Sequence, residues 1–223
     1  MEWHRQFLLG YSQGRFVLGT SHMMEARTWQ PHAMRGFSLV ELMIGLAIVA
    51  FLLMMGVPAF GTYIQNAKLR STADNFYSGL QSARAEAVKR NTPVEFIMTD
   101  DSGISANSQT ANLSTTGRNW IVRVQDPTTL LYTFVEGKPA AEGSGTTGTS
   151  TVDITGTTSS VVFNGFGATT LGASATFSFS NPTGGLCKAA GGPMRCLSIV
   201  ASIGGQARLC DPAVTTAGDT RKC

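Results

Sequence analysis

One apolar segment near the N-terminus constrains this 223-residue chain more than any other feature. Leu42 to Ala59 is almost wholly hydrophobic, and the carboxylate of Glu41 is the only side-chain charge between Gly36 and Lys68. A helix of ~20 apolar residues crosses the hydrocarbon core of a bilayer. An acid inside such a helix costs roughly 2.5–3.5 kcal/mol on insertion, so Glu41 is expected to have a partner. The sequence therefore predicts a transmembrane or assembly helix over 37–67 with one functional carboxylate.

The residues before this helix form a specific pattern. Gly36 is followed by Phe37, and Glu41 lies five residues into the chain that begins there. This arrangement resembles the type IV prepilin processing site. The resemblance implies that a prepilin peptidase removes residues 1–36 as a leader and methylates Phe37, and that Glu41 then guides assembly. Pro58 stands where pilins of this kind commonly have a proline, and it is expected to kink the helix.

The resemblance also implies a location. The precursor would cross the inner membrane once, with its C-terminal domain in the periplasm, and would later enter a filament. A secretory signal is the competing interpretation, but that signal has a shorter apolar core and a cleavage site after it. Translation from Met23 or Met24 would give a shorter leader that keeps Arg27 and Arg35 on the cytoplasmic side.

Residues 68–91 are predicted to continue the helix in amphipathic form. Apolar residues recur at spacings of three and four, which places them on one stripe, and Asn91-Thr92-Pro93 is a stop signal after basic Lys89 and Arg90. The stripe is expected to pack on a sheet of the same chain. Its members are Leu69, Ala73, Phe76, Leu80, Ala83 and Ala87.

Residues 92–223 change to short β-type runs between Gly, Ser, Thr and Asn, which predicts a β-rich periplasmic domain. Ser102–Gly117 and Gly137–Ser160 are expected to be loops. The fold class is α+β: a long N-terminal helix packed on a small antiparallel β-sheet or β-sandwich. The predicted strands are Val94–Thr99, Trp120–Val124, Leu130–Val135, Val161–Phe163, Ala175–Ser180, Cys196–Ser202 and Gln206–Cys210.

Two internal segments narrow the resemblance. The segments Gln81–Asn91 and Val161–Gly167, followed by the strand with Phe177 and Phe179, resemble the GspH/FimT branch of pilin-like proteins. That branch contains minor pilins of type IV pili and minor pseudopilins of type II secretion systems. The resemblance implies a FimT-like minor pilin that enters or primes a pilus, or alternatively a GspH-type pseudopilin. Its partners would be the peptidase, other major or minor pilins or pseudopilins, and inner-membrane lipid.

Four cysteines, Cys187, Cys196, Cys210 and Cys223, lie in the last part of the chain, without a C-x-x-C pair or a nearby His. In an oxidising periplasm they are expected to form two disulfides rather than a zinc site. Pairing of Cys196 with Cys210 across a hairpin that turns at Gly204-Gly205 would leave Cys187 for Cys223. The sequential pairing, 187–196 with 210–223, is the main alternative.

An enzyme is not predicted. His4, His22 and His32 all lie in the leader, so the processed chain would have no imidazole for a Ser-His or Cys-His pair. The carboxylates follow no metal-ligand spacing, and no phosphate-binding Gly-rich motif joins a strand to a helix. No cofactor and no metal are expected.

DNA binding for natural transformation is a further alternative. Some members of the branch resemble DNA receptors with a G-R-x-R motif, and here the corresponding residues, Gly205-Gln206-Ala207-Arg208, lack its first Arg. Basic residues near the cysteines would give weak, salt-sensitive phosphate contacts if they share a face. Otherwise they are ordinary solvated charges. These residues are Lys188, Arg195, Arg208, Arg221 and Lys222.

Overall fold

The computed structural model describes residues 36–101, 108–138 and 151–223, without the side chains of 55–59. Residues up to Gly45 belong to one compact unit, and Leu46–Cys223 form the other. Within the described residues, the helix α1 spans Leu39–Arg90 and is followed by short strands and two 3-10 turns. The strands are β1 Val94–Thr99, β2 Asn119–Gln125, β3 Tyr132–Lys138, β4 Asp153–Gly156, β5 Ser160–Phe163, β6 Ala175–Ser180, β7 Leu197–Ala201 and β8 Ala207–Cys210. The 3-10 turns are η2 Pro182–Gly184 and η3 Lys188–Ala190.

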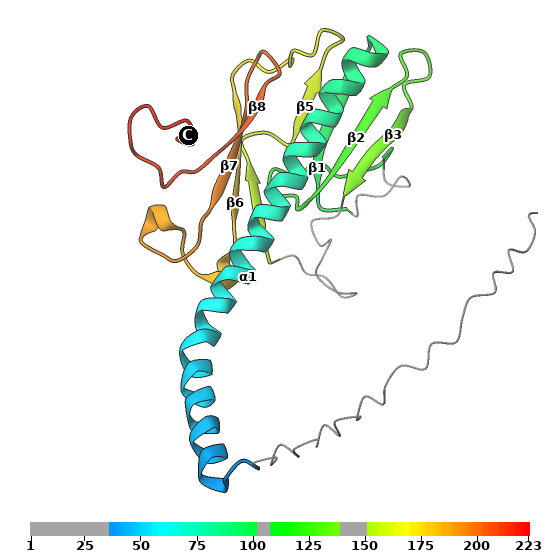
Figure 1. Cartoon of the computed structure of the whole chain (residues 1–223). Coiled ribbons are helices and arrows are strands. Elements are labelled where there is room, and N and C mark those ends of the chain that lie inside the picture. The colour runs from blue at the N-terminus through cyan, green and yellow to red at the C-terminus, as the bar shows by residue number, and fades with distance from the viewer. Residues whose placement is uncertain (1–35, 102–107, 139–150) are drawn as a thin grey trace, which may run out of the picture. The chain divides into compact units, whose positions relative to one another are not determined.

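The strands form two antiparallel sheets of four strands each. The first sheet has the order β3-β2-β1-β5, and the second has the order β4-β6-β7-β8. Strand β1 is central in its sheet, pairing with β2 through Val94–Val124 and with β5 through Val94–Phe163. Strand β7 likewise pairs with β6 and β8. The C-terminal half of α1 lies across both sheets (Figure 1), which confirms the predicted α+β class.

The predicted stripe on the helix is the part that enters the core. All six of its side chains, from Leu69 to Ala87, are fully buried. Phe76 joins the two sheets, because its ring lies 4.8 Å from that of Phe96 in β1 and 4.9 Å from that of Phe177 in β6. Burial of a large aromatic side chain contributes roughly 1.5–3 kcal/mol, so Phe76 is a main link between α1 and both sheets.

The helix ends as the sequence predicts, with a capping motif at its C-terminus. Asn91 adopts a left-handed conformation (φ 52°). Its N–H donates to the carbonyl of Val88, and the N–H of Thr92 donates to the carbonyl of Ala87, both at 3.3 Å. This is the Schellman arrangement, in which Asn is an accepted substitute for Gly. It turns the chain directly into β1.

Most predicted strands are confirmed within one or two residues, and those over Val94–Thr99 and Ala175–Ser180 match β1 and β6 at both ends. The prediction of a strand from Leu130 was wrong at its start. Leu130 has a φ of 60° and belongs to a turn in which Asp126 accepts hydrogen bonds from the N–H groups of Thr128 and Thr129. Strand β3 therefore begins at Tyr132.

The predicted loop Gly137–Ser160 was also wrong in part. Residues 139–150 lie outside the described residues, but Asp153–Gly156 forms β4 at the edge of the second sheet. Its Ile154 is 2% exposed and pairs with Phe179 of β6. Four residues rich in Thr and Gly carry little strand signal, so the pairing with β6 decides this strand.

Candidate functional site

The start of α1 is built by local hydrogen bonds around Glu41. Ser38 is the N-cap: its Oγ accepts from the N–H of Glu41, and its carbonyl accepts from the N–H of Leu42, both at 3.1 Å. Ser38 and Glu41 follow the S-x-x-E spacing of a capping box. Gly36 and Phe37 precede the helix in irregular backbone, and Phe37 is 82% exposed. Processing at this junction stays a prediction.

The apolar part of α1 has no covering element in the described residues. The large side chains from Leu39 to Met54 are exposed, as are Phe60 and Tyr63. In the part of the chain that the structure describes, no helix meets the length and hydropathy needed to cross a membrane. The predicted membrane segment 37–67 stays a prediction. Pro58 lies among the residues whose side chains are outside the description, although the backbone is helical there.

Polar contacts hold α1 where it enters the β-rich domain. The buried Asn181 donates from Nδ2 to Oε1 of Gln65 at 2.8 Å. The backbone N–H of Arg195 donates to Oδ1 of Asn66 at 2.7 Å. These contacts fix the segment between β6 and β7 against the helix just before its buried stripe begins at Leu69.

The cysteines pair sequentially, as Cys187–Cys196 and Cys210–Cys223, with Cα–Cα distances of 5.4 and 5.1 Å. The first-named alternative, Cys196 with Cys210, was wrong. The β7–β8 hairpin does turn at Gly204-Gly205, but its register pairs Cys210 with Ser198 rather than with Cys196. Cys196 instead closes the loop that contains η3, and Cys223 ties the C-terminal tail to the end of β8.

The five basic residues predicted for DNA binding do not all lie in one place. Four of them lie near β8 and the tail, and several are already engaged. Arg208 donates to the carbonyl of Lys222 at 2.9 Å, and Arg221 pairs with Asp219 at 2.8 Å. The hydrogen bond from Arg221 lowers the pKa of Asp219 to about 2. Lys188 lines a separate cavity of about 220 Å³ beside the Cys187–Cys196 disulfide.

A larger groove runs between α1 and the end of β8. Its volume is about 860 Å³, within the range of ~300–1,000 Å³ typical of ligand sites. Sequence reasoning found only two of its charged residues, because four separate segments of the chain meet here. We call it the α1–β8 groove, lined by Tyr63, Asn66, Ala67, Arg70, Ser71, Asp74, Asn75, Arg195, Leu197, Leu209, Cys210, Asp211 and Arg221.

The segments that carried the GspH/FimT resemblance meet at the other end of the helix. Nε of Arg84 donates to the carbonyl of Gly167 at 3.1 Å. Gly205, in the β7–β8 turn, has a φ of +79°, and a Cβ there would lie 1.7 Å from the Gly167 carbonyl oxygen. Only glycine allows this approach, so Gly205 serves packing, whatever else the turn does.

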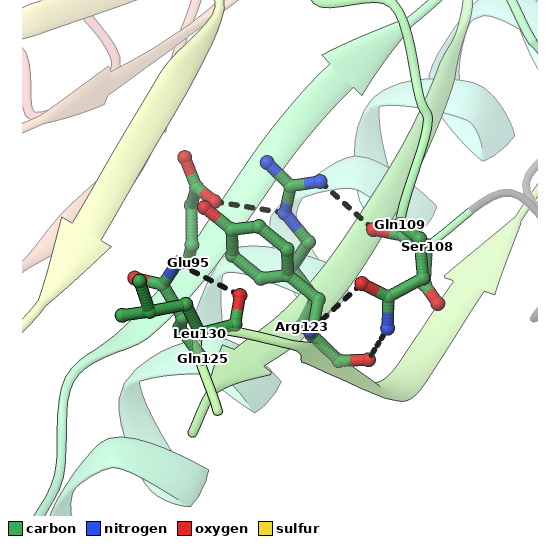
Figure 2. A network of polar contacts seen from close by, with 7 residues as sticks. Glu95, Ser108, Gln109, Arg123, Gln125 and Leu130 are labelled. Atoms are coloured by element: carbon green, nitrogen blue, oxygen red, sulfur yellow. Dashed lines mark hydrogen bonds and ion pairs between the residues drawn. The ribbon is translucent and has the colours of Figure 1, made fainter. Parts of the chain in front are cut away.

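A buried ion pair lies on the face of the first sheet that points away from α1. Nε of Arg123 in β2 donates to Oε2 of Glu95 in β1 at 2.8 Å, and its Nη1 donates to the carbonyl of Ser108 at 2.8 Å (Figure 2). The guanidinium lies 3.7 Å from the centre of the Tyr132 ring. Gln109 also binds the backbone of Tyr132, so this network fixes the loop before β2. The two residues are directly paired in register.

Some of the other described carboxylates form ion pairs, such as Asp74 with Arg70, and others hold turns and loops. Oδ2 of Asp101 accepts from the backbone N–H of Asn112 at 2.7 Å. The backbone carbonyl of Asp101 accepts from the side-chain Nδ2 of Asn119 at 2.6 Å. No group of three or more His, Cys, Asp and Glu side chains placed to hold a metal occurs among the residues that the structure describes.

Two protein-family models match this chain, each over a different range of residues. The family model of the type II transport protein GspH matches residues 72–205, which is more than half of the chain. The prokaryotic N-terminal methylation motif matches residues 32–57, around Gly36, Phe37 and Glu41. A search of curated proteins gives no match.

Similar solved structures include a type IV minor pilin and a minor pseudopilin. The minor pilin FimU of Pseudomonas aeruginosa is 14% identical over 66% of this chain and 91% of its own, with a TM-score of 0.45. The minor pseudopilin EpsH of Vibrio cholerae is 12% identical over 66% and 99%, with a TM-score of 0.44. GspH of E. coli is 20% identical over 70% and 93%, with a TM-score of 0.38. On the family match, this chain belongs to the GspH family of pilin-like subunits, which are structural proteins rather than enzymes.

Proposed function

We propose that this chain is a minor type IV pilin that is cut after Gly36, methylated on Phe37 and then incorporated into a pilus or used to prime one. The N-terminal methylation motif over 32–57 is the observation that carries the proposal. The uncovered apolar side chains from Leu39 to Met54 support it, because exposed apolar surface of this extent marks a membrane or protein contact.

In this mechanism the inner membrane holds residues 37–67 until the subunit enters the filament. The carboxylate of Glu41 then leaves the lipid and forms an ion pair with the methylated ammonium of Phe37 in a neighbouring subunit. A buried ion pair can set the register of packed helices even when its net energy is small. The N-cap at Ser38 supports this role, since it fixes the first turn and therefore the position of Glu41.

Substitution of Glu41 tests the proposed role. Glu41→Ala and the isosteric Glu41→Gln should both leave the chain in the inner membrane, because insertion depends on the apolar residues. Both should reduce its amount in sheared filaments by about tenfold or more, since a lost charged contact of roughly 1.5–3 kcal/mol corresponds to such a factor. Quantitative mass spectrometry of membrane and filament fractions gives both amounts.

Asp153→Asn is the matched control, because it neutralises an exposed carboxylate that pairs with Arg118 far along the chain. It should enter filaments as the wild type does. Normal incorporation of Glu41→Gln would contradict the role of the charge. A mature N-terminus upstream of Phe37 would contradict the whole proposal.

A GspH-type pseudopilin of a type II secretion system is the second candidate, favoured by the description of the matching family model. The two candidate functions predict different defects in a strain from which this chain is deleted. Loss of the chain should reduce surface pili if it is a minor pilin, and should leave exoproteins in the periplasm if it is a pseudopilin. Counting pili and assaying secreted proteins in one deletion strain separates the two.

A further inference from the structure

The α1–β8 groove combines an apolar floor with a charged rim. Its apolar lining includes Ala67 of α1, Leu197 of β7 and Leu209 of β8, and both leucines pack against the core. The rim holds three guanidinium groups and two carboxylates. The Cys210–Cys223 disulfide forms part of the wall, because it holds the tail that carries Arg221. The groove is therefore a built feature of the fold.

Most of the rim charges are already paired. Arg70 binds Asp74 along the helix at 2.9 Å, and Arg221 binds Asp219. Asp211 accepts from the N–H of Ala213 at 2.9 Å. Arg195 differs: its backbone is fixed on Asn66, but its exposed guanidinium has no ion pair or hydrogen bond to any residue that the structure describes. Among the described lining residues, Arg195 is thus the one guanidinium without an ion pair, and Asp211 is the one carboxylate without one.

The α1–β8 groove lies next to the apolar part of α1. Tyr63 lies at one end of it, directly after the uncovered apolar part of α1. Lys68 and Arg70 are the first charges after Glu41. Tyr is enriched at the level of lipid headgroups, where Lys and Arg side chains also reach the interface. If residues 37–67 lie in the membrane, as the proposed function requires, the groove opens at the periplasmic headgroups.

We propose that the α1–β8 groove binds one anionic phospholipid while the subunit waits in the membrane, an inference that rests on the proposed function. The phosphate diester contacts the guanidinium of Arg195, a group that suits phosphate geometry. The first part of the acyl chains lies on Leu197 and Leu209. DNA fits less well, because it needs several open cations, and Arg195 is the one guanidinium among the described lining residues without an ion pair.

Native mass spectrometry of the full chain in detergent micelles tests the proposal. The micelles contain equal amounts of phosphatidylglycerol and phosphatidylcholine. The wild type should retain one phosphatidylglycerol in preference to phosphatidylcholine. Arg195→Gln should retain about tenfold less, because a charge-assisted contact of roughly 1.5–3 kcal/mol is lost. Arg90→Gln, the same change at the far end of α1, should bind as the wild type does.

Four outcomes would overturn the proposal. The first is equal retention of phosphatidylglycerol by Arg195→Gln, and the second is equal retention of both lipids by the wild type. The third is displacement of phosphatidylglycerol by millimolar inorganic phosphate, which would show a free-anion site. The fourth, displacement by a DNA duplex, would assign the groove to nucleic acid instead. Membrane fractionation of cells reports separately on the proposed function, since micelle binding does not depend on insertion in the cell.

Discussion

At the scale of single residues, the Glu95–Arg123 pair shows what sequence reasoning misses. Both residues lie on strands among apolar neighbours, so the sequence alone shows each as an isolated charge without a partner. Their side chains are only 17% and 6% exposed, and the pairing of β1 with β2 sets them opposite each other. Removal of one member of a buried pair leaves the other charge without compensation. This pair therefore matters more for stability than the exposed ion pairs on α1.

Arg123→Ala should lower the free energy of unfolding by about 3–5 kcal/mol, because Glu95 would remain buried and unpaired. The double variant Glu95→Leu/Arg123→Met should recover most of that loss, since apolar side chains of similar volume can replace a buried pair. Urea unfolding followed by the fluorescence of buried Trp120 gives both values.

Arg70→Ala serves as the control for that series. Its ion pair with Asp74 is exposed, and such pairs contribute ~0–1 kcal/mol. A loss for Arg123→Ala no larger than that for Arg70→Ala would mean that water reaches the Glu95 carboxylate.

At the scale of elements, patterns of period two and period 3.6 predict most of the fold. The apolar stripe from Leu69 to Ala87 and the alternation of residues in β6 are clear sequence signals. Each is clear because one face of the element is buried along its whole length. Strand β4 escaped prediction because its four residues lie in a Gly- and Thr-rich stretch, and its place depends on pairing with β6. The sequence did not decide the pairing of the four cysteines, for a related reason. Their pairing depends on the register of the β7–β8 hairpin, which a turn sequence alone does not set.

Peptide mapping under non-reducing conditions checks the disulfides. Trypsin can cut after Lys188, Arg195, Arg208 and Lys222, which places each cysteine on its own peptide. We expect two crosslinked pairs, one joining the peptides of Cys187 and Cys196 and the other joining those of Cys210 and Cys223. A crosslink between the peptides of Cys196 and Cys210 would contradict the register of β7 and β8.

At the scale of the whole molecule, charge balance bears on the DNA alternative. The chain carries 17 Lys and Arg against 14 Asp and Glu. Removal of residues 1–36 takes away four Arg and two Glu, which leaves a net charge of +1. Sequence predicted a cluster of basic residues, but could not show that Arg208 and Arg221 bind groups of their own tail. Nor could it find the groove, whose walls come from four separate segments of the chain.

Full-length protein should therefore bind DNA weakly and lose that binding as salt is raised. We expect no gel retardation of a 30-base-pair duplex at about 150 mM salt, because few open cations remain to release counterions. The Gln206→Arg variant, which restores the G-R-x-R pattern, is the informative comparison. Strong retardation by the unaltered chain at that salt concentration would favour the DNA-binding alternative.

The positions of the two disulfides determine which part of the chain would be released by reduction. Each closes a short stretch of chain, with sequence separations of 9 and 13 residues, and neither bond joins α1 to a sheet or one sheet to the other. We therefore expect α1 and the two sheets to pack in the same way when the thiols are reduced. Reduction of Cys210–Cys223 would free the C-terminal tail, because that bond holds Cys223 at the end of β8.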